Sequence, residues 1–145
     1  MTSLQQIYSE VLVRHFKEPA HKGRLTNETL YETGYNPKCG DVINLSISCV
    51  DDGTIQEIMF DGKGCMICQA SASILTRQVR NITSDEAKQL IHEVEKLFDK
   101  EHIGEIPLPD DVKALGSISR YPTRKQCVTL AWQTLGRALQ RHYSR

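Results

Sequence analysis

An alternating segment in the first half of the chain constrains the fold most strongly. Between residues 43 and 49, isoleucine, leucine and cysteine alternate with asparagine and serine, which predicts a strand with one face in the core and one in water. Residues 51–53 (Asp-Asp-Gly) form a hairpin-turn sequence, so residues 55–61 are expected to return as the partner strand. Residues 29–35 predict one further short strand. We therefore expect an antiparallel sheet that is open to water on one face.

Helical patterns lie on both sides of this predicted sheet. Apolar residues predict a helix over 3–17, a second from Cys65 to about residue 78, and a last one over about 123–142. A capping box, Thr83–Glu86, opens another. Glycine and proline predict that 99–121 is irregular, with a short helix near 111–116. The order of elements predicts an α+β fold, a small antiparallel β-sheet with α-helices packed on one face.

The length and charge of the chain narrow its class. A chain of 145 residues is expected to form a single domain over 1–145. Lysine plus arginine and aspartate plus glutamate number 18 each, so no basic surface is predicted for nucleic acid. We see no signal peptide and no apolar run long enough to cross a membrane. The sequence therefore predicts a cytoplasmic location.

Five cysteines are many for a chain of this kind, and their odd number argues against a disulfide framework. Cys39 lies in a Pro- and Gly-flanked turn, Cys65 in a Gly-rich turn into a helix, and Cys127 in the first turns of the last helix. Together with Asp41 they predict a four-ligand metal site. Such a donor set suits Zn²⁺, and thiolates also hold a transient iron–sulfur cluster.

Position along the chain suggests different roles for these side chains. Asp41 shares its parity with the core-facing residues of the strand, so its carboxylate is expected to point inward and to need a partner; alternatively it caps the preceding turn. The helix start stabilises a thiolate at Cys65, and Arg124 and Lys125 add positive charge near Cys127. The loop residue Cys39 is best able to leave a metal and meet a partner.

The remaining candidates are weaker. Cys65 and Cys68 form a CxxC pair, which is a redox dithiol, half of a zinc knuckle, or a site cysteine beside a spare thiol. Cys49 is expected to pack in the core. The histidines are expected at the surface or as caps, and the sequence indicates no Ser/His/Asp arrangement; they are residues 15, 21, 92, 102 and 142.

Three motifs carry a resemblance that covers nearly the whole chain, in order and at suitable spacing. They are Asn-Pro-Lys-Cys-Gly-Asp at 36–41, Gly-Lys-Gly-Cys at 62–65 followed by Ala-Ser-Ala-Ser at 70–73, and Arg-Lys-Gln-Cys at 124–127 with Leu-Ala-Trp at 130–132. They resemble the U-type iron–sulfur cluster assembly proteins. The resemblance implies an α+β fold, Zn²⁺ bound by Cys39, Asp41, Cys65 and Cys127, and a pyridoxal-phosphate cysteine desulfurase as partner.

Within that family the chain looks like the SufU branch, because it lacks the Leu-Pro-Pro-Val-Lys segment and the histidine of the IscU branch. The resemblance then implies a zinc-dependent sulfur acceptor that serves downstream iron–sulfur assembly proteins. Cys39 leaves the zinc, a desulfurase ligand replaces it, and the Cys39 thiolate attacks the partner's persulfide. Arg124 is a candidate for docking or for steadying the site charge. Gln126 and Cys68 depart from the usual residues of the family.

Two other functions stay open at this point. The same cysteines suit a scaffold on which a [2Fe–2S] cluster is assembled and passed to apo-proteins. They also suit a zinc-stabilised interaction domain without thiol chemistry. Tightly held zinc favours sulfur transfer, whereas an oxygen-labile brown protein favours the scaffold.

Overall fold

The structure is a computed structural model that describes residues 3–50, 52–99 and 108–143. Expectations for residue 51, for 100–107 and for His102 lie outside these residues. The described elements are, in order, α1 (Leu4–Lys17), β1 (Leu30–Asn36), β2 (Asp41–Cys49), β3 (Ile55–Lys63), α2 (Met66–Gln78), α3 (Ser84–Lys96), α4 (Asp110–Gly116), the 3-10 turns η1 (Ser117–Arg120) and η2 (Pro122–Arg124), and α5 (Lys125–Tyr143).

The three strands form the predicted antiparallel sheet in the order β1-β2-β3. Asn36 pairs with Asp41 at the end of the first hairpin, so residues 37–40 form its turn. This turn is closed by a hydrogen bond from the Gly40 N–H to the Asn36 carbonyl at 2.8 Å. The hairpin therefore carries Cys39 at its tip.

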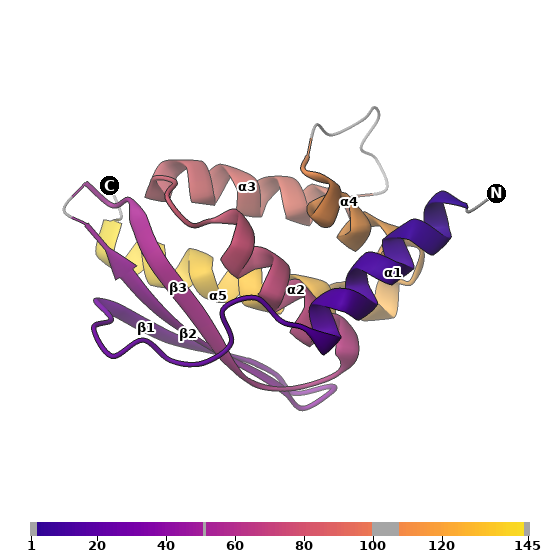
Figure 1. The fold of residues 1–145 in the computed structure, drawn as a ribbon, viewed down its shortest axis with the longest axis horizontal. Helices are drawn as coiled ribbons and strands as arrows, with labels where there is room; N and C mark the ends of the chain where they lie inside the picture. Colours follow the sequence, from indigo (N-terminus) through magenta and orange to yellow (C-terminus); the bar gives the residue numbers. More distant parts are fainter. Residues whose placement is uncertain (1–2, 51, 100–107, 144–145) are drawn as a thin grey trace.

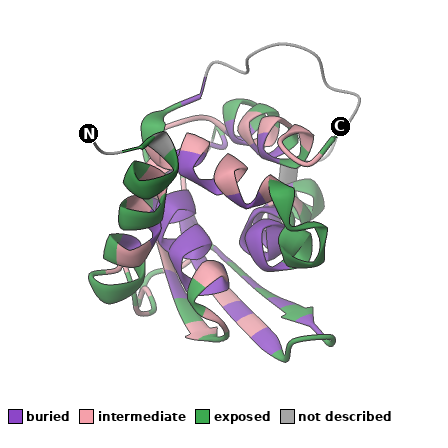
Figure 2. Cartoon of the chain, turned by 90° about the vertical axis from the view of Figure 1, so that its right-hand side faces the viewer, coloured by how far each residue is buried: buried purple, intermediate pink, exposed green. Residues whose placement is uncertain are grey.

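The helices gather on one face of the sheet, as predicted (Figure 1). α5 packs on β1 and β2, α2 packs on β3 and α5, and α1 packs on α2 and α4. Buried residues line the surfaces where the sheet and these helices face one another (Figure 2). Phe60 and Leu45 of the sheet and Trp132 of α5 are completely buried there. The α+β prediction is confirmed.

Local sequence accounts for where the helices begin. The Thr83 hydroxyl accepts a hydrogen bond from the Glu86 N–H, and the Glu86 carboxylate accepts one from the Thr83 N–H. This is the predicted capping box of α3. Pro122 starts a 3-10 turn, so α5 begins at Lys125, two residues after the predicted start. The short helix predicted near 111–116 is α4.

The second face of the sheet is less open to water than the alternation predicted. Ser46, on that face, is buried, with 1% of its surface exposed. The connection between α1 and β1 crosses there: the Leu25 N–H donates to Ser46 Oγ at 3.0 Å. The same connection pairs with the edge of β3, where the Gly23 N–H donates to the Phe60 carbonyl at 2.7 Å. The alternating sequence predicted which face of the sheet is polar. It did not predict that the connection between α1 and β1 covers part of that face.

The expectation that every histidine lies at the surface is wrong for His15. This side chain is buried between Ser73 Oγ, 2.7 Å from Nδ1, and Asp111 Oδ2, 3.0 Å from Nε2. A Ser/His/Asp arrangement is therefore present after all, although Ser73 is itself completely buried and accessible to no substrate. The network ties α1 to α2 and α4. No helix of the described residues is long and apolar enough to cross a membrane.

Candidate metal centre

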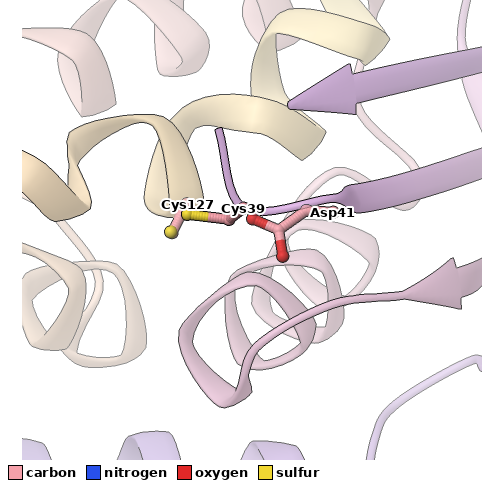
Figure 3. A group of neighbouring side chains, drawn as sticks. All are labelled: Cys39, Asp41 and Cys127. Carbon is pink, nitrogen blue, oxygen red and sulfur yellow. The ribbon is translucent and has the colours of Figure 1, made fainter. Parts of the chain in front are cut away.

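The structure brings together three of the four predicted ligands. One ligand atom each from Cys39, Asp41 and Cys127 lies within 4.8 Å of the others. They come from the hairpin turn, the first residue of β2 and the first turn of α5 (Figure 3). Cys39 is exposed, whereas Asp41 and Cys127 are each only 1% exposed. The group therefore has one solvent-facing thiol above two buried donors.

Close contact between β1 and α5 sets this arrangement. A Cβ on Gly34 would lie 1.9 Å from the Thr134 hydroxyl oxygen, so only glycine lets the strand approach the helix this closely. Glu32 of β1 pairs with Arg141 of α5 at 3.1 Å, which holds the two elements together. The hairpin tip is thereby held over the start of α5, where Cys127 lies.

Asp41 points inward, as its parity predicted. Its Oδ1 accepts a hydrogen bond from the Cys65 N–H at 3.0 Å and its Oδ2 accepts one from Asn36 Nδ2 at 3.3 Å. Space for the carboxylate depends on Gly64, where a Cβ would lie 2.6 Å from Oδ1. Asn36 supports the site although the sequence predicted no role for it, and Gly64, expected only to let the backbone approach a ligand, makes room for the Asp41 carboxylate. Asn36 lies in the sequence motif at 36–41 and Gly64 in the motif at 62–65, and these two motifs are the signal that points to both residues.

Cys65 lies beside this trio, but its sulfur is not within 4.8 Å of all three of the other ligand atoms. It is the N-cap of α2, and its Sγ accepts a hydrogen bond from the Cys68 N–H at 3.4 Å. A hydrogen bond also joins the Cys65 and Cys127 thiols. Cys65 therefore contacts both buried donors of the trio, Asp41 through its backbone and Cys127 through its sulfur.

Both burial and charge act on Cys127, and the positive charge expected from Arg124 is present. Burial, followed by the hydrogen bond to Cys65, raises the pKa of the Cys127 thiol, so it carries its proton at neutral pH when no metal is bound. Arg124 is exposed and hydrogen-bonds the Cys127 sulfur, a contact that raises the pKa of the guanidinium. A metal bound through Cys127 would therefore displace a proton from a buried thiol.

The donor set fits a thiophilic metal. A carboxylate has about four lone-pair sites, and each oxygen of Asp41 accepts one hydrogen bond from a neutral group. Within residues 3–50, 52–99 and 108–143, no lysine, arginine or histidine pairs with it. A buried carboxylate without a cation is costly. Three thiols around it supply the soft ligands that Zn²⁺ or an iron–sulfur cluster prefers.

The other cysteines divide between core and site. Cys49 is half-buried and packs against the core, as expected. Cys68 is completely buried in α2. Burial raises the pKa of Cys68, followed by the nearby Asp41, Cys65, Cys127 and Cys39. Cys68 thus lies next to the whole site.

Comparison with known proteins decides the family. Residues 7–145 match the family model described as the NifU-like N-terminal domain. The chain belongs to this family. A NifU-like chain named iron–sulfur cluster assembly scaffold protein IscU, from Thermotoga maritima, is 36% identical over 94% of this chain and 95% of its own length. The role of the protein therefore lies in iron–sulfur cluster assembly.

Two further relatives extend this result. The zinc-dependent sulfurtransferase SufU of Bacillus subtilis is 33% identical over 92% of this NifU-like chain and 89% of its own length. The crystal structure of FiSufU from Fervidobacterium islandicum AW-1 superposes with a TM-score of 0.84 at 30% identity, over 93% of this chain and 98% of that one. Relatives of both kinds have similar identity, so overall similarity does not separate the IscU and SufU branches of the NifU-like family.

Proposed function

We propose that this protein is a zinc-dependent sulfur acceptor of the SufU type, which takes persulfide sulfur from a cysteine desulfurase onto Cys39. One observation carries the proposal: Cys39 is the exposed thiol of a trio whose other donors are buried. It lies in a turn of four residues, whereas Asp41 and Cys127 belong to a strand and a helix. Cys39 can therefore leave the metal and reach a partner while the others stay in place.

The transfer is a thiol exchange. The Cys39 thiolate attacks the outer sulfur of the partner's cysteine persulfide, forming a new S–S bond to Cys39. The partner's S–S bond breaks, and its cysteine leaves as a thiolate. No electrons are gained or lost overall. The persulfide on Cys39 is then available to downstream iron–sulfur assembly proteins.

The other site residues have supporting roles. Bound zinc would keep Cys39 deprotonated at neutral pH without redox chemistry of its own. Asp41, Cys65 and Cys127 would hold the ion throughout the exchange. Arg124, exposed and hydrogen-bonded to the Cys127 sulfur, is placed to attract the negatively charged persulfide and to balance the site charge.

Exposed apolar side chains near the site support docking of the desulfurase around Cys39. Tyr35, Met66 and Tyr121 are large, solvent-exposed side chains, and each lies within four residues of Cys39, Cys65 or Arg124. Exposed aromatic and methionine side chains are common anchors of protein interfaces. We call these three residues the collar. A partner that covers the collar would bring its persulfide to the hairpin tip.

A second function has its own support. The same thiols and carboxylate suit a [2Fe–2S] cluster as cargo, and the IscU scaffold of Thermotoga maritima is 36% identical. Against this, Gln126 precedes Cys127 where the IscU branch has histidine, and the Leu-Pro-Pro-Val-Lys segment is absent. We therefore place sulfur transfer first and the scaffold second.

Desulfurase turnover separates the candidate functions. Zinc-loaded protein is added to a cognate desulfurase, turnover is followed, and persulfide is mapped by mass spectrometry. We expect stimulation and a sulfur adduct on Cys39, both lost in Cys39→Ala and retained in Cys49→Ser, which alters a cysteine outside the site. Normal stimulation by Cys39→Ala would contradict the transfer role. Freshly purified protein that holds iron and sulfide in place of zinc would favour the scaffold.

A further inference from the structure

Cys68 is a buried thiol that the proposed transfer does not use. It is completely buried as the third residue of α2. Its N–H donates to Cys65 Sγ at 3.4 Å, but within the described parts of the chain no hydrogen bond engages its own sulfur. Cys68 belongs to the buried core cluster, so its thiol is shielded from solvent next to a predicted ligand.

The position of Cys68 on its helix places it beside the site. The side chain of the third helical residue leans back toward the N-cap, as it does in a capping box. The N-cap here is Cys65, and its Sγ accepts the Cys68 N–H at 3.4 Å, so the main chain of Cys68 lies directly beside a site sulfur. The Cys-x-x-Cys spacing of these two residues is the one with which paired thiolates hold zinc in structural sites. The charges that act on Cys68 come from all four predicted ligands.

We propose that Cys68 is a reserve ligand that replaces Cys39 when Cys39 leaves to carry sulfur. The ion then stays bound by Asp41, Cys65, Cys68 and Cys127, all buried or half-buried. Cys68 gives up its proton to water as its sulfur binds, since only the thiolate is a ligand. The chain itself thus supplies the replacement that the family resemblance assigned to the desulfurase. This inference rests on the proposed function in one respect: sulfur transfer is the reason why Cys39 leaves the metal.

Metal binding by variants, without any desulfurase, tests this exchange. Zinc affinity is measured by competition with a chromophoric chelator, and thiolate ligands are counted from the sulfur-to-metal charge-transfer absorbance of Co²⁺-loaded protein. Cys39→Ala is expected to keep three thiolates. Adding Cys68→Ser should leave two and lower zinc affinity by roughly tenfold or more. Adding Cys49→Ser, the matched control, should leave three. Equal thiolate counts and affinities in Cys39→Ala with and without Cys68→Ser would overturn the proposal.

A second measurement needs no combined substitutions. Exposed Cys39 is alkylated with iodoacetamide in zinc-loaded protein, and released zinc is measured. Protein with Cys68 should retain zinc after alkylation, whereas Cys68→Ser should release it at least several-fold faster. Equal release from both would count against the reserve ligand. Neither measurement includes a desulfurase, so loss of ligand exchange and failure of sulfur transfer are distinguished.

Discussion

At the scale of single residues, the site depends on small groups next to a buried carboxylate. Asp41 is held by the backbone of Cys65 and the side chain of Asn36, and Gly64 leaves room for it. The inward direction of Asp41 was predictable, because a strand alternates its side chains. That Gly64 makes room for Asp41 in particular was not predictable, because the contact joins residues 23 positions apart in the chain.

Gly64→Ala should displace the Asp41 carboxylate. The new Cβ would lie 2.6 Å from Oδ1 and 3.1 Å from Cβ of Asp41, whose side chain is itself buried. We expect zinc affinity, measured by chelator competition, to fall by roughly tenfold or more. Gly136→Ala is the control, since its Cβ would meet Ile91 at an ordinary 3.7 Å. Unchanged affinity in Gly64→Ala would argue against ligation by Asp41.

At the scale of elements, the contact of β1 with α5 places Cys39 over Cys127. The sequence predicts both elements from local patterns, but their close approach depends on Gly34 and Thr134, which are a hundred positions apart. Contacts between distant parts of the chain also explain why His15 was wrongly expected at the surface. Periodicity shows which residues share a helix face, but it does not show that Asp111 of α4 will lie against that face.

Gly34→Ala tests this placement. A Cβ at 1.9 Å from Thr134 Oγ1 should force β1 away from α5, lowering the free energy of unfolding by about 2 kcal/mol or more in denaturant titrations. Zinc affinity should fall with it, because the hairpin tip moves from Cys127.

Removing the opposing hydroxyl provides the matched test of mechanism. Thr134→Ala combined with Gly34→Ala should recover part of both losses, since the closest contact is gone while Leu130 Cδ1 remains at 3.1 Å. Strictly additive effects of the two substitutions would show that steric contact with Thr134 does not set the strand's position.

At the scale of the whole molecule, the metal site opens at a surface that carries the collar. Two exposed tyrosines on β1 offer a matched comparison. Tyr35, 61% exposed, is four residues from Cys39, whereas Tyr31, 39% exposed, packs against Arg24 away from the hairpin tip. If the collar docks a desulfurase, only the first should matter for the partner.

We expect Tyr35→Ala to raise the concentration needed for half-maximal desulfurase stimulation by roughly tenfold, the size of one lost aromatic anchor. Stimulation at saturation should stay near its normal level, because Cys39 is intact. Tyr31→Ala should leave both values close to those of the unaltered protein. Similar shifts from the two substitutions would place docking elsewhere.

The metal centre also has an order of assembly. Its donors at positions 39, 41 and 65 leave the ribosome early, whereas Cys127 follows only with the start of α5. Chains are made from the N-terminus, and non-local contacts form after the segments that make them exist. A nascent chain that stops short of α5 therefore lacks a buried donor and the helix that positions the hairpin. Loading of the proposed metal centre would therefore come late, only in chains that have completed their last helix.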